Sequence, residues 1–96
     1  MKHCIIVKYK PEVDDACKVR LASEIRGLFE AALKIEGIHR IEVRKNVVRM
    51  PNRYDLLIEM DMDETALPKF DGSILHRQWK EQYGSILQNK TIIDLE

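Results

Sequence analysis

The chain carries no excess charge of either sign, and this balance excludes two kinds of partner. Its 96 residues include 16 lysines and arginines and 16 aspartates and glutamates, so the formal net charge is zero. Proteins that bind nucleic acid need a surplus of basic residues on one face, and anionic membrane surfaces attract the same surplus. We therefore expect neither a nucleic acid nor a membrane among the partners of this protein.

Long hydrophobic runs, glycines and cysteines are scarce as well. The apolar run after Lys2 is interrupted by Lys8 and Lys10, too early for a signal peptide, and no segment is long enough to span a bilayer. The 4 glycines are dispersed and form no phosphate-binding loop. Cys4 and Cys17 match neither a disulfide framework nor the spacing of metal ligands. We expect a reduced, cytoplasmic protein with no metal ion and no cofactor.

What the sequence does contain is a series of strand and helix patterns within one domain, residues 1–96. The segment Lys2–Tyr9 is apolar on both faces through its middle, which is typical of a strand shielded from water on both sides. Its two faces consist of His3, Ile5, Val7 and Tyr9 on one side and Cys4, Ile6 and Lys8 on the other. Helices can cover one face of a small sheet, so the second face needs a partner.

A long helix, three further strands and shorter helical segments follow. Apolar residues at steps of three and four predict an amphipathic helix that starts at a cap, Asp14 or Asp15, and ends at Gly37. Asp63 and Ser73 are the predicted caps of the shorter helical segments. The stripe of the long helix is Cys17, Leu21, Ile25, Leu28, Phe29, Ala32 and Leu33. The further strands are His39–Val48, Tyr54–Met62, with an apolar face of Tyr54, Leu56, Ile58 and Met60, and Lys90–Glu96.

This order of elements predicts an α+β fold, a ferredoxin-like sandwich with a four-stranded antiparallel sheet and helices on one face. The first and third strands would be central, and the charged second strand would be an edge. The open face would expose isoleucine, leucine and valine side chains, and such a patch usually marks an interface. Two copies packed sheet to sheet about a twofold axis would bury it, so we expect a homodimer. The alternative is a monomer whose open face is more polar.

Three histidines and an aromatic pair are the candidates for chemistry, and the histidine spacing matches no metal site. His3 lies among the apolar positions of the first strand, either as a base at a cavity or as a hydrogen-bonded structural residue. His76 follows the start of a helix, which favours a neutral acid–base imidazole, although a solvated surface residue is the alternative. His39 is expected to be structural or on the surface. Trp79 and Tyr83 share a helix face, where core packing is a more usual role than lining a pocket.

Four segments resemble, in order, parts of the stress-responsive A/B barrel (Dabb) family. Residues 2–11 (KHCIIVKYKP) resemble its opening strand, residues 53–60 (RYDLLIEM) its third strand, and residues 91–96 (TIIDLE) its closing strand. Ser73-Ile-Leu-His76 stands where many members have His-Pro-x-His. The resemblance implies a dimeric α/β barrel, made when two ferredoxin-like sheets pack face to face, with a pocket between sheet and helices in each subunit.

The resemblance also suggests site residues. Some members, the plant polyketide cyclases, use a histidine and a tyrosine to cyclise a polyketide. At the matching positions the catalytic histidine falls on His76 and a pocket histidine on His3. The tyrosine falls near Phe70, which has no hydroxyl, a third-strand histidine falls near Leu56, and the first histidine of the motif is Ser73. His76 would therefore be a base without the phenol that assists it in the cyclases.

Three hypotheses for function follow. The leading one is a cytoplasmic homodimer that binds a small, mostly apolar molecule in a cavity beside both histidines. Its ligand-binding residues would be His3, Leu56, Phe70, His76 and Trp79. One alternative is a cofactor-free cyclase, isomerase or monooxygenase-like enzyme with His76 as its general base. Another is a dimeric stress-related protein that has no small-molecule site.

Overall fold

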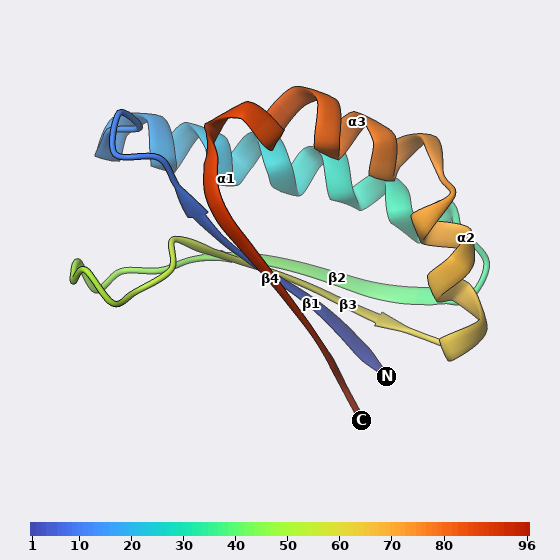
Figure 1. Ribbon diagram of the computed structural model, residues 1–96. Coiled ribbons are helices and arrows are strands. Elements are labelled where there is room, and N and C mark those ends of the chain that lie inside the picture. The colour runs from blue at the N-terminus through green and yellow to red at the C-terminus, as the bar shows by residue number, and fades with distance from the viewer.

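The protein folds as a single antiparallel sheet with all its helices on one face, which confirms the predicted α+β architecture (Figure 1). This computed structural model describes all residues, 1–96. The elements are β1 (Lys2–Tyr9), α1 (Asp15–Glu30), β2 (Ile38–Lys45), β3 (Leu56–Met62), α2 (Leu67–Asp71), α3 (Ile74–Tyr83) and β4 (Leu87–Leu95). Three short 3-10 turns occupy Ala31–Lys34, Glu64–Ala66 and Gly84–Ile86. No helix is long and apolar enough to cross a membrane.

The strand order is β2-β3-β1-β4, so β1 and β3 are central and β2 is an edge, as predicted. Every neighbouring pair is antiparallel. In the register of β1 and β4, Lys2 lies opposite Leu95 and His3 lies opposite Asp94. The two chain ends therefore meet at one end of the sheet, where Figure 1 marks N and C.

The helix-covered face of the sheet holds the core. Alternate side chains of β1 are buried there because successive residues of a strand point to opposite faces, and β3 alternates in the same way. These strands pack against the apolar sides of α1 and α3. The buried strand residues are His3, Ile5, Val7, Tyr9, Leu56, Ile58, Met60 and Met62, and the buried helix residues include Leu21, Ile25, Phe29, Leu75, Trp79 and Tyr83.

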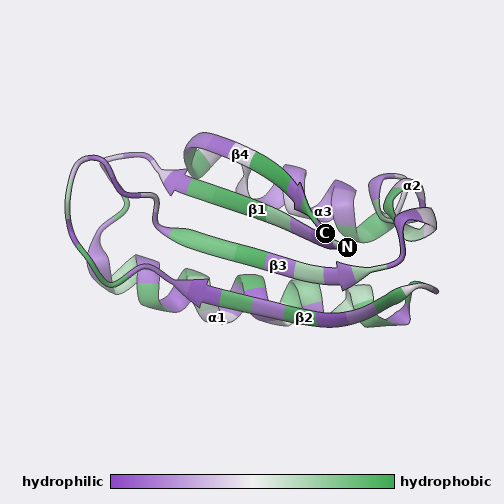
Figure 2. Ribbon diagram, turned by 90° about the horizontal axis from the view of Figure 1, so that it is seen from below, coloured by the Kyte–Doolittle hydropathy of each residue, from purple (hydrophilic) through white to green (hydrophobic).

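The open face of the sheet is turned toward the viewer in Figure 2, where apolar stretches run along β1 and β3. Ile6 of β1 and Leu57 of β3 are neighbours in the strand register and are partly exposed. Beside them, β4 contributes Ile93 and Leu95, which are 46% and 44% exposed. Cys4 is the one buried member of this face in β1.

Charged side chains border this apolar strip. Glu59 of β3 forms ion pairs with Arg44 of β2 (3.5 Å) and Lys2 of β1 (3.6 Å). The prediction that valines face outward is wrong, because Val7 and Val43 are buried under the helices. The open face is apolar along its centre and toward β4, and charged toward β2.

The predicted caps Asp14, Ser73 and Asp63 all stand at the start of a helical segment, and two of the three make a side-chain cap. An Asp14 carboxylate oxygen accepts a hydrogen bond from the Cys17 amide (2.8 Å), and this bond lowers the pKa of Asp14. The Ser73 hydroxyl accepts one from the His76 amide (3.1 Å). Asp63 makes no side-chain cap and instead pairs with the exposed His39 (3.0 Å).

The first helix ends earlier than predicted. It stops at Glu30 and continues only as the 3-10 turn, and Leu33 of the predicted stripe is exposed because that turn rotates it away from the core. Gly37 instead forms the turn into β2, with φ of 93°. A Cβ at that position would lie 2.9 Å from the Ala66 Cβ, so glycine is required both by conformation and by space.

The strand ends between β2 and β3 also differ from the prediction. The second strand ends at Lys45 rather than Val48, and the Asn46 side chain bonds the backbone of Val48 just after it. Tyr54 precedes β3 and does not share a face with Leu56. Its hydroxyl lies across the open face, 3.1 Å from the Thr91 hydroxyl. The last strand begins at Leu87, three residues before the predicted start at Lys90.

Candidate functional site

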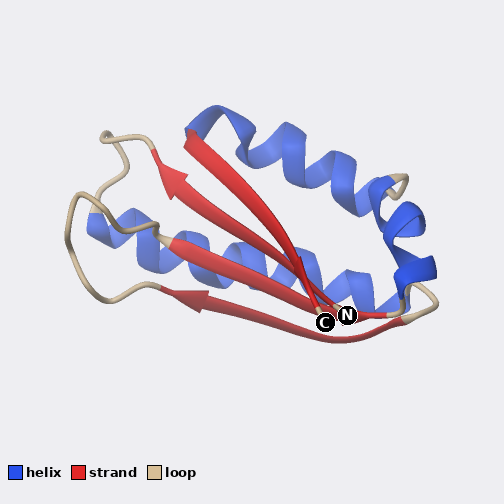
Figure 3. Ribbon diagram, turned by 60° about the horizontal axis from the view of Figure 1, so that its bottom comes forward, coloured by secondary structure: helices blue, strands red, loops and turns tan.

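Three of the predicted site residues meet at the end of the sheet where the chain ends lie. His3 comes from β1, Phe70 from α2 and His76 from α3, and α2 closes this end of the helical layer (Figure 3). The Phe70 ring contacts both imidazoles, with its centre 5.7 Å from that of His3 and 5.1 Å from that of His76. The two histidines therefore share one neighbour, although they are far apart in the sequence.

His3 is buried, and its ring is fixed by a carboxylate. Its Nδ1 lies 2.5 Å from an Asp94 side-chain oxygen, across the register that pairs β1 with β4. Because an ionised carboxylate only accepts hydrogen bonds, Nδ1 is the donor and carries a proton. The other ring nitrogen, Nε2, makes no hydrogen bond. This is the arrangement in which a carboxylate orients an imidazole and leaves its far nitrogen available to a bound molecule.

His76 has a similar arrangement, built from the backbone. Its Nδ1 lies 3.0 Å from the Asp71 carbonyl oxygen, so Nδ1 donates and Nε2 is again without a partner. The Ser73 hydroxyl connects α2 to the start of α3. It donates a hydrogen bond to the Phe70 carbonyl oxygen (2.6 Å) and accepts one from the His76 amide. Partial burial and the nearby Lys80 ammonium lower the pKa of His76, so its neutral form is favoured near pH 7.

From the lowered pKa of His76 we predict how the stability of the folded protein changes with pH. When pH falls below about 6.5, the unfolded imidazole takes up a proton before the folded one does, so the folded state loses stability as pH falls further. His76→Gln should make the free energy of unfolding less sensitive to pH between about 7 and 5. Urea unfolding at a series of pH values measures this slope. The matched control is His39→Gln, and an unchanged slope in His76→Gln would contradict the prediction.

No cavity is lined by both histidines; Phe70, which contacts both rings, is fully buried. The predicted cavity beside both histidines is therefore absent from the structure. His76 borders only a shallow polar hollow on the outer side of α3, of about 250 Å³.

The other two predicted residues lie elsewhere in the core. Trp79 contacts Phe29 (ring centres 5.2 Å apart), and Phe29 in turn contacts Phe70 (6.2 Å), so Trp79 is one ring removed from the site. Trp79 and Tyr83 pack in the core, as expected for this pair. Leu56 lies opposite Val7 in the strand register. Val7 is four residues along β1 from His3, a separation of about 13 Å, so Leu56 lies away from the histidines.

The remaining candidates for chemistry are isolated. No group of three or more histidine, cysteine or acidic side chains is placed to hold a metal ion. Cys4 and Cys17 are both free thiols, and burial and the nearby Glu59 raise the pKa of Cys4. A protonated, buried thiol is a weak nucleophile, so Cys4 is a packing residue of the open face.

Asp94 is the site residue that sequence reasoning missed. To find Asp94 from the sequence, one would need to know which residues of the first and last strands lie opposite each other. In the predicted topology the first and last strands are antiparallel neighbours, so some residue of the last strand must face His3, but the sequence does not say which one. The structure supplies the register, which pairs Lys2 with Leu95 and His3 with Asp94.

No protein-family model and no curated protein sequence matches this chain. Solved structures do match it over nearly its whole length. A dimeric protein of unknown function with a ferredoxin-like fold from Bacteroides fragilis has a TM-score of 0.81 at 18% identity, covering 99% of this chain and 93% of its own. Further dimeric ferredoxin-like proteins of unknown function are also among the matches.

Two other similar structures have more specific descriptions. A Dabb family protein with a ferredoxin-like fold from Mesorhizobium loti has a TM-score of 0.75 at 13% identity, covering 99% of this chain and 93% of its own. A hydroxynitrile lyase from Passiflora edulis has a TM-score of 0.69 at 7% identity, covering 96% and 87%. At these identities the likeness concerns the fold. The chain thus has the ferredoxin-like fold shared by a Dabb family protein and several dimeric proteins, which confirms the fold and the resemblance predicted from its sequence.

Proposed function

We propose that the protein is a homodimer in which each subunit binds one small, mostly apolar molecule beside His3 and His76. The observation that supports this most is the pair of imidazoles in contact with Phe70, each with Nδ1 engaged and Nε2 free. Small-molecule sites are mainly apolar and contain a few fixed polar groups that orient the ligand. Two held histidines among aromatic side chains meet that description.

Binding at this site requires the Phe70 ring to move, because it packs against both imidazoles. Phe70 belongs to α2, a helix of 5 residues between a 3-10 turn and Gly72. So short a helix has little internal stability, and its position depends on the packing of its side chains. A ligand that replaced the Phe70 ring against His3 and His76 would regain the buried contacts that the ring gives up.

The homodimer is supported by the open face of the sheet. A strip of Ile6, Leu57, Ile93 and Leu95 is left partly exposed in a single copy. A contiguous apolar strip rimmed by charged residues is typical of an interface, and a twofold axis presents the same strip on both copies. Two sheets packed in this way would form the barrel that the resemblance implies. The dimeric proteins among the similar structures favour the same assembly.

The ligand site is tested by following the three histidines in a titration with indole, a neutral apolar probe. In protein labelled at histidine, the ring resonances of His3 and His76 should shift together and reach saturation. His39 is the internal control, because it is exposed and pairs with Asp63. Saturable binding that leaves the His3 and His76 resonances unmoved would contradict the proposed site.

A second candidate function is acid–base catalysis on the bound molecule, and the His3–Asp94 pair is the observation in its favour. A similar structure is described as a hydroxynitrile lyase, which gives one instance of an enzyme with this fold. The sequence suggested His76 as the general base, and the oriented His3 is an equal candidate. Turnover of a co-purifying molecule should be lost in His76→Ala or in His3→Ala while the dimer mass persists. Turnover retained in both variants would exclude this function.

A further inference from the structure

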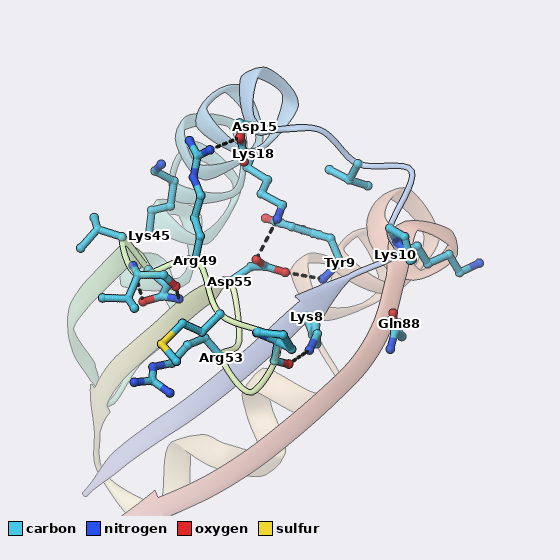
Figure 4. Close-up of a pocket in the computed structure, with 17 residues that line it drawn as sticks. Lys8, Tyr9, Lys10, Asp15, Lys18, Lys45, Arg49, Arg53, Asp55 and Gln88 are labelled. Atoms are coloured by element: carbon cyan, nitrogen blue, oxygen red, sulfur yellow. Dashed lines mark hydrogen bonds and ion pairs between the residues drawn. The ribbon is translucent and has the colours of Figure 1, made fainter.

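The end of the sheet away from His3 contains a cavity with a volume of about 450 Å³. Figure 4 shows its lining, which comes from the end of β1, the turn into α1 and the loop between β2 and β3. It lies beyond Tyr9, six residues along β1 from His3, or about 20 Å. This cavity is therefore separate from the site beside the histidines.

Basic residues are concentrated around this cavity, although the whole chain is neutral. Two acidic residues line it, and both are already paired: Asp55 with Lys18 (3.1 Å) and Asp15 with Arg49 (2.7 Å). Asp55 also accepts a hydrogen bond from the Tyr9 amide (2.8 Å). The six basic residues of the lining are Lys8, Lys10, Lys18, Lys45, Arg49 and Arg53.

The other basic groups have no carboxylate partner. Lys8 donates to the Pro51 carbonyl oxygen (2.6 Å), and Lys10, Lys45 and Arg53 form no ion pair. Four uncompensated positive charges around one cavity create a local field that attracts anions and holds them where solvent is partly excluded. The guanidinium of Arg53 is suited to a carboxylate or phosphate, which it can bind with two parallel hydrogen bonds.

A buried hydroxyl without a partner also points to a ligand. Tyr9 lines the cavity and is 4% exposed, and its hydroxyl is the one side-chain nitrogen or oxygen atom in the protein that is fully shielded from solvent and makes no hydrogen bond. Buried polar groups in folded proteins nearly always have a partner, because leaving one unpaired is unfavourable. Burial and the nearby Asp55 raise the pKa of Tyr9, so this hydroxyl stays protonated and can donate.

We propose that this cavity binds a small organic anion, with Lys45 and Arg53 drawing in its charged group and the Tyr9 hydroxyl donating to it. The loop from β2 to β3 adds exposed apolar side chains, Val47, Val48 and Met50, beside these basic residues. The fitting ligand therefore has a carboxylate or phosphate at one end and an apolar group at the other. The volume suits a molecule of metabolite size.

Phenyl phosphate tests the proposal, with benzyl alcohol as its neutral counterpart. Calorimetry should detect phenyl phosphate binding that weakens as salt rises, and backbone amide shifts should map to residues 8–18 and 45–55. Lys45→Glu/Arg53→Glu should weaken it at least tenfold. Lys34→Glu/Lys80→Glu changes the net charge equally, at two exposed lysines that have no ion pair and lie outside the cavity, and should alter binding by less than twofold.

Tyr9→Phe provides an independent readout. It removes the unpartnered hydroxyl, so without phenyl phosphate the melting temperature should stay the same or rise. The rise in melting temperature that phenyl phosphate gives the wild type should be reduced in this variant. Three results would overturn the proposal: equal weakening by both double variants, binding of benzyl alcohol as tight as that of phenyl phosphate, or amide shifts elsewhere. Because the two sites are separate, His3 and His76 resonances should not respond to phenyl phosphate.

Discussion

Replacing Phe70 by alanine should destabilise the protein by about 3–5 kcal/mol, the usual effect of removing a fully buried phenylalanine side chain. The ring contacts Phe29, His3 and His76, so its loss leaves a cavity bounded by three aromatic rings. For a domain of this size that is a large share of the total stability, which is typically 5–15 kcal/mol. Urea unfolding at one fixed protein concentration measures the change.

The same substitution should create the binding site that the Phe70 ring otherwise fills. Indole should bind Phe70→Ala more tightly than the wild type, because the ring no longer has to be displaced, and should restore part of the lost stability. The matched control is Ile74→Ala, an exposed apolar residue at the start of α3, which should cost little. A loss below about 1 kcal/mol for Phe70→Ala would show that the ring is not packed against the histidines.

Placing glutamate at Ile93 should dissociate the proposed homodimer, whereas glutamate at Ile92 should not. The two residues are adjacent in β4, are 46% and 49% exposed, and face opposite sides of the sheet, Ile93 on the open face. In a twofold sheet-to-sheet dimer both subunits carry the Ile93→Glu substitution, so the apolar interface would contain two carboxylates. We expect the dimer dissociation constant to rise at least about a hundredfold, which corresponds to about 2.8 kcal/mol.

Sedimentation velocity at micromolar concentration separates the outcomes of this pair. Ile93→Glu should sediment as a species of 11.3 kDa, and Ile92→Glu should keep the mass of the wild type. Because both isoleucines are about equally exposed, loss of folding should affect the two variants alike and is checked by circular dichroism. Dissociation in both variants, or in neither, would contradict an interface on the open face.

The fold was predictable because its main signals lie in short stretches of sequence. A first strand that is apolar on both faces indicated a central position, and the period of the α1 stripe indicated one helix-covered face. At two places where the prediction failed, one side chain forms a bond that the sequence pattern does not indicate. The Asn46 side chain bonds the Val48 backbone after β2, and Tyr54 bonds across the open face to Thr91 instead of joining the core.

The candidate site was only partly predictable, because it depends on contacts between distant segments. The sequence pointed to His3, Phe70 and His76, but not to the Phe70 ring packing against both imidazoles. Asp94 depended on the register of β4, which shifts near Tyr9 and is not marked by any local pattern. The basic cavity depended on how the loop between β2 and β3 folds over Tyr9, and no periodic pattern specifies such a loop.

Native mass spectrometry of the protein purified from its own host tests the central proposal most directly, because it reports assembly and ligand together. We predict a species of twice 11.3 kDa that carries additional mass equivalent to one small molecule per subunit. Collisional heating should release that molecule before the two chains separate, since it is held within each subunit. A monomer, or a dimer whose mass is that of two bare chains, would contradict the proposal.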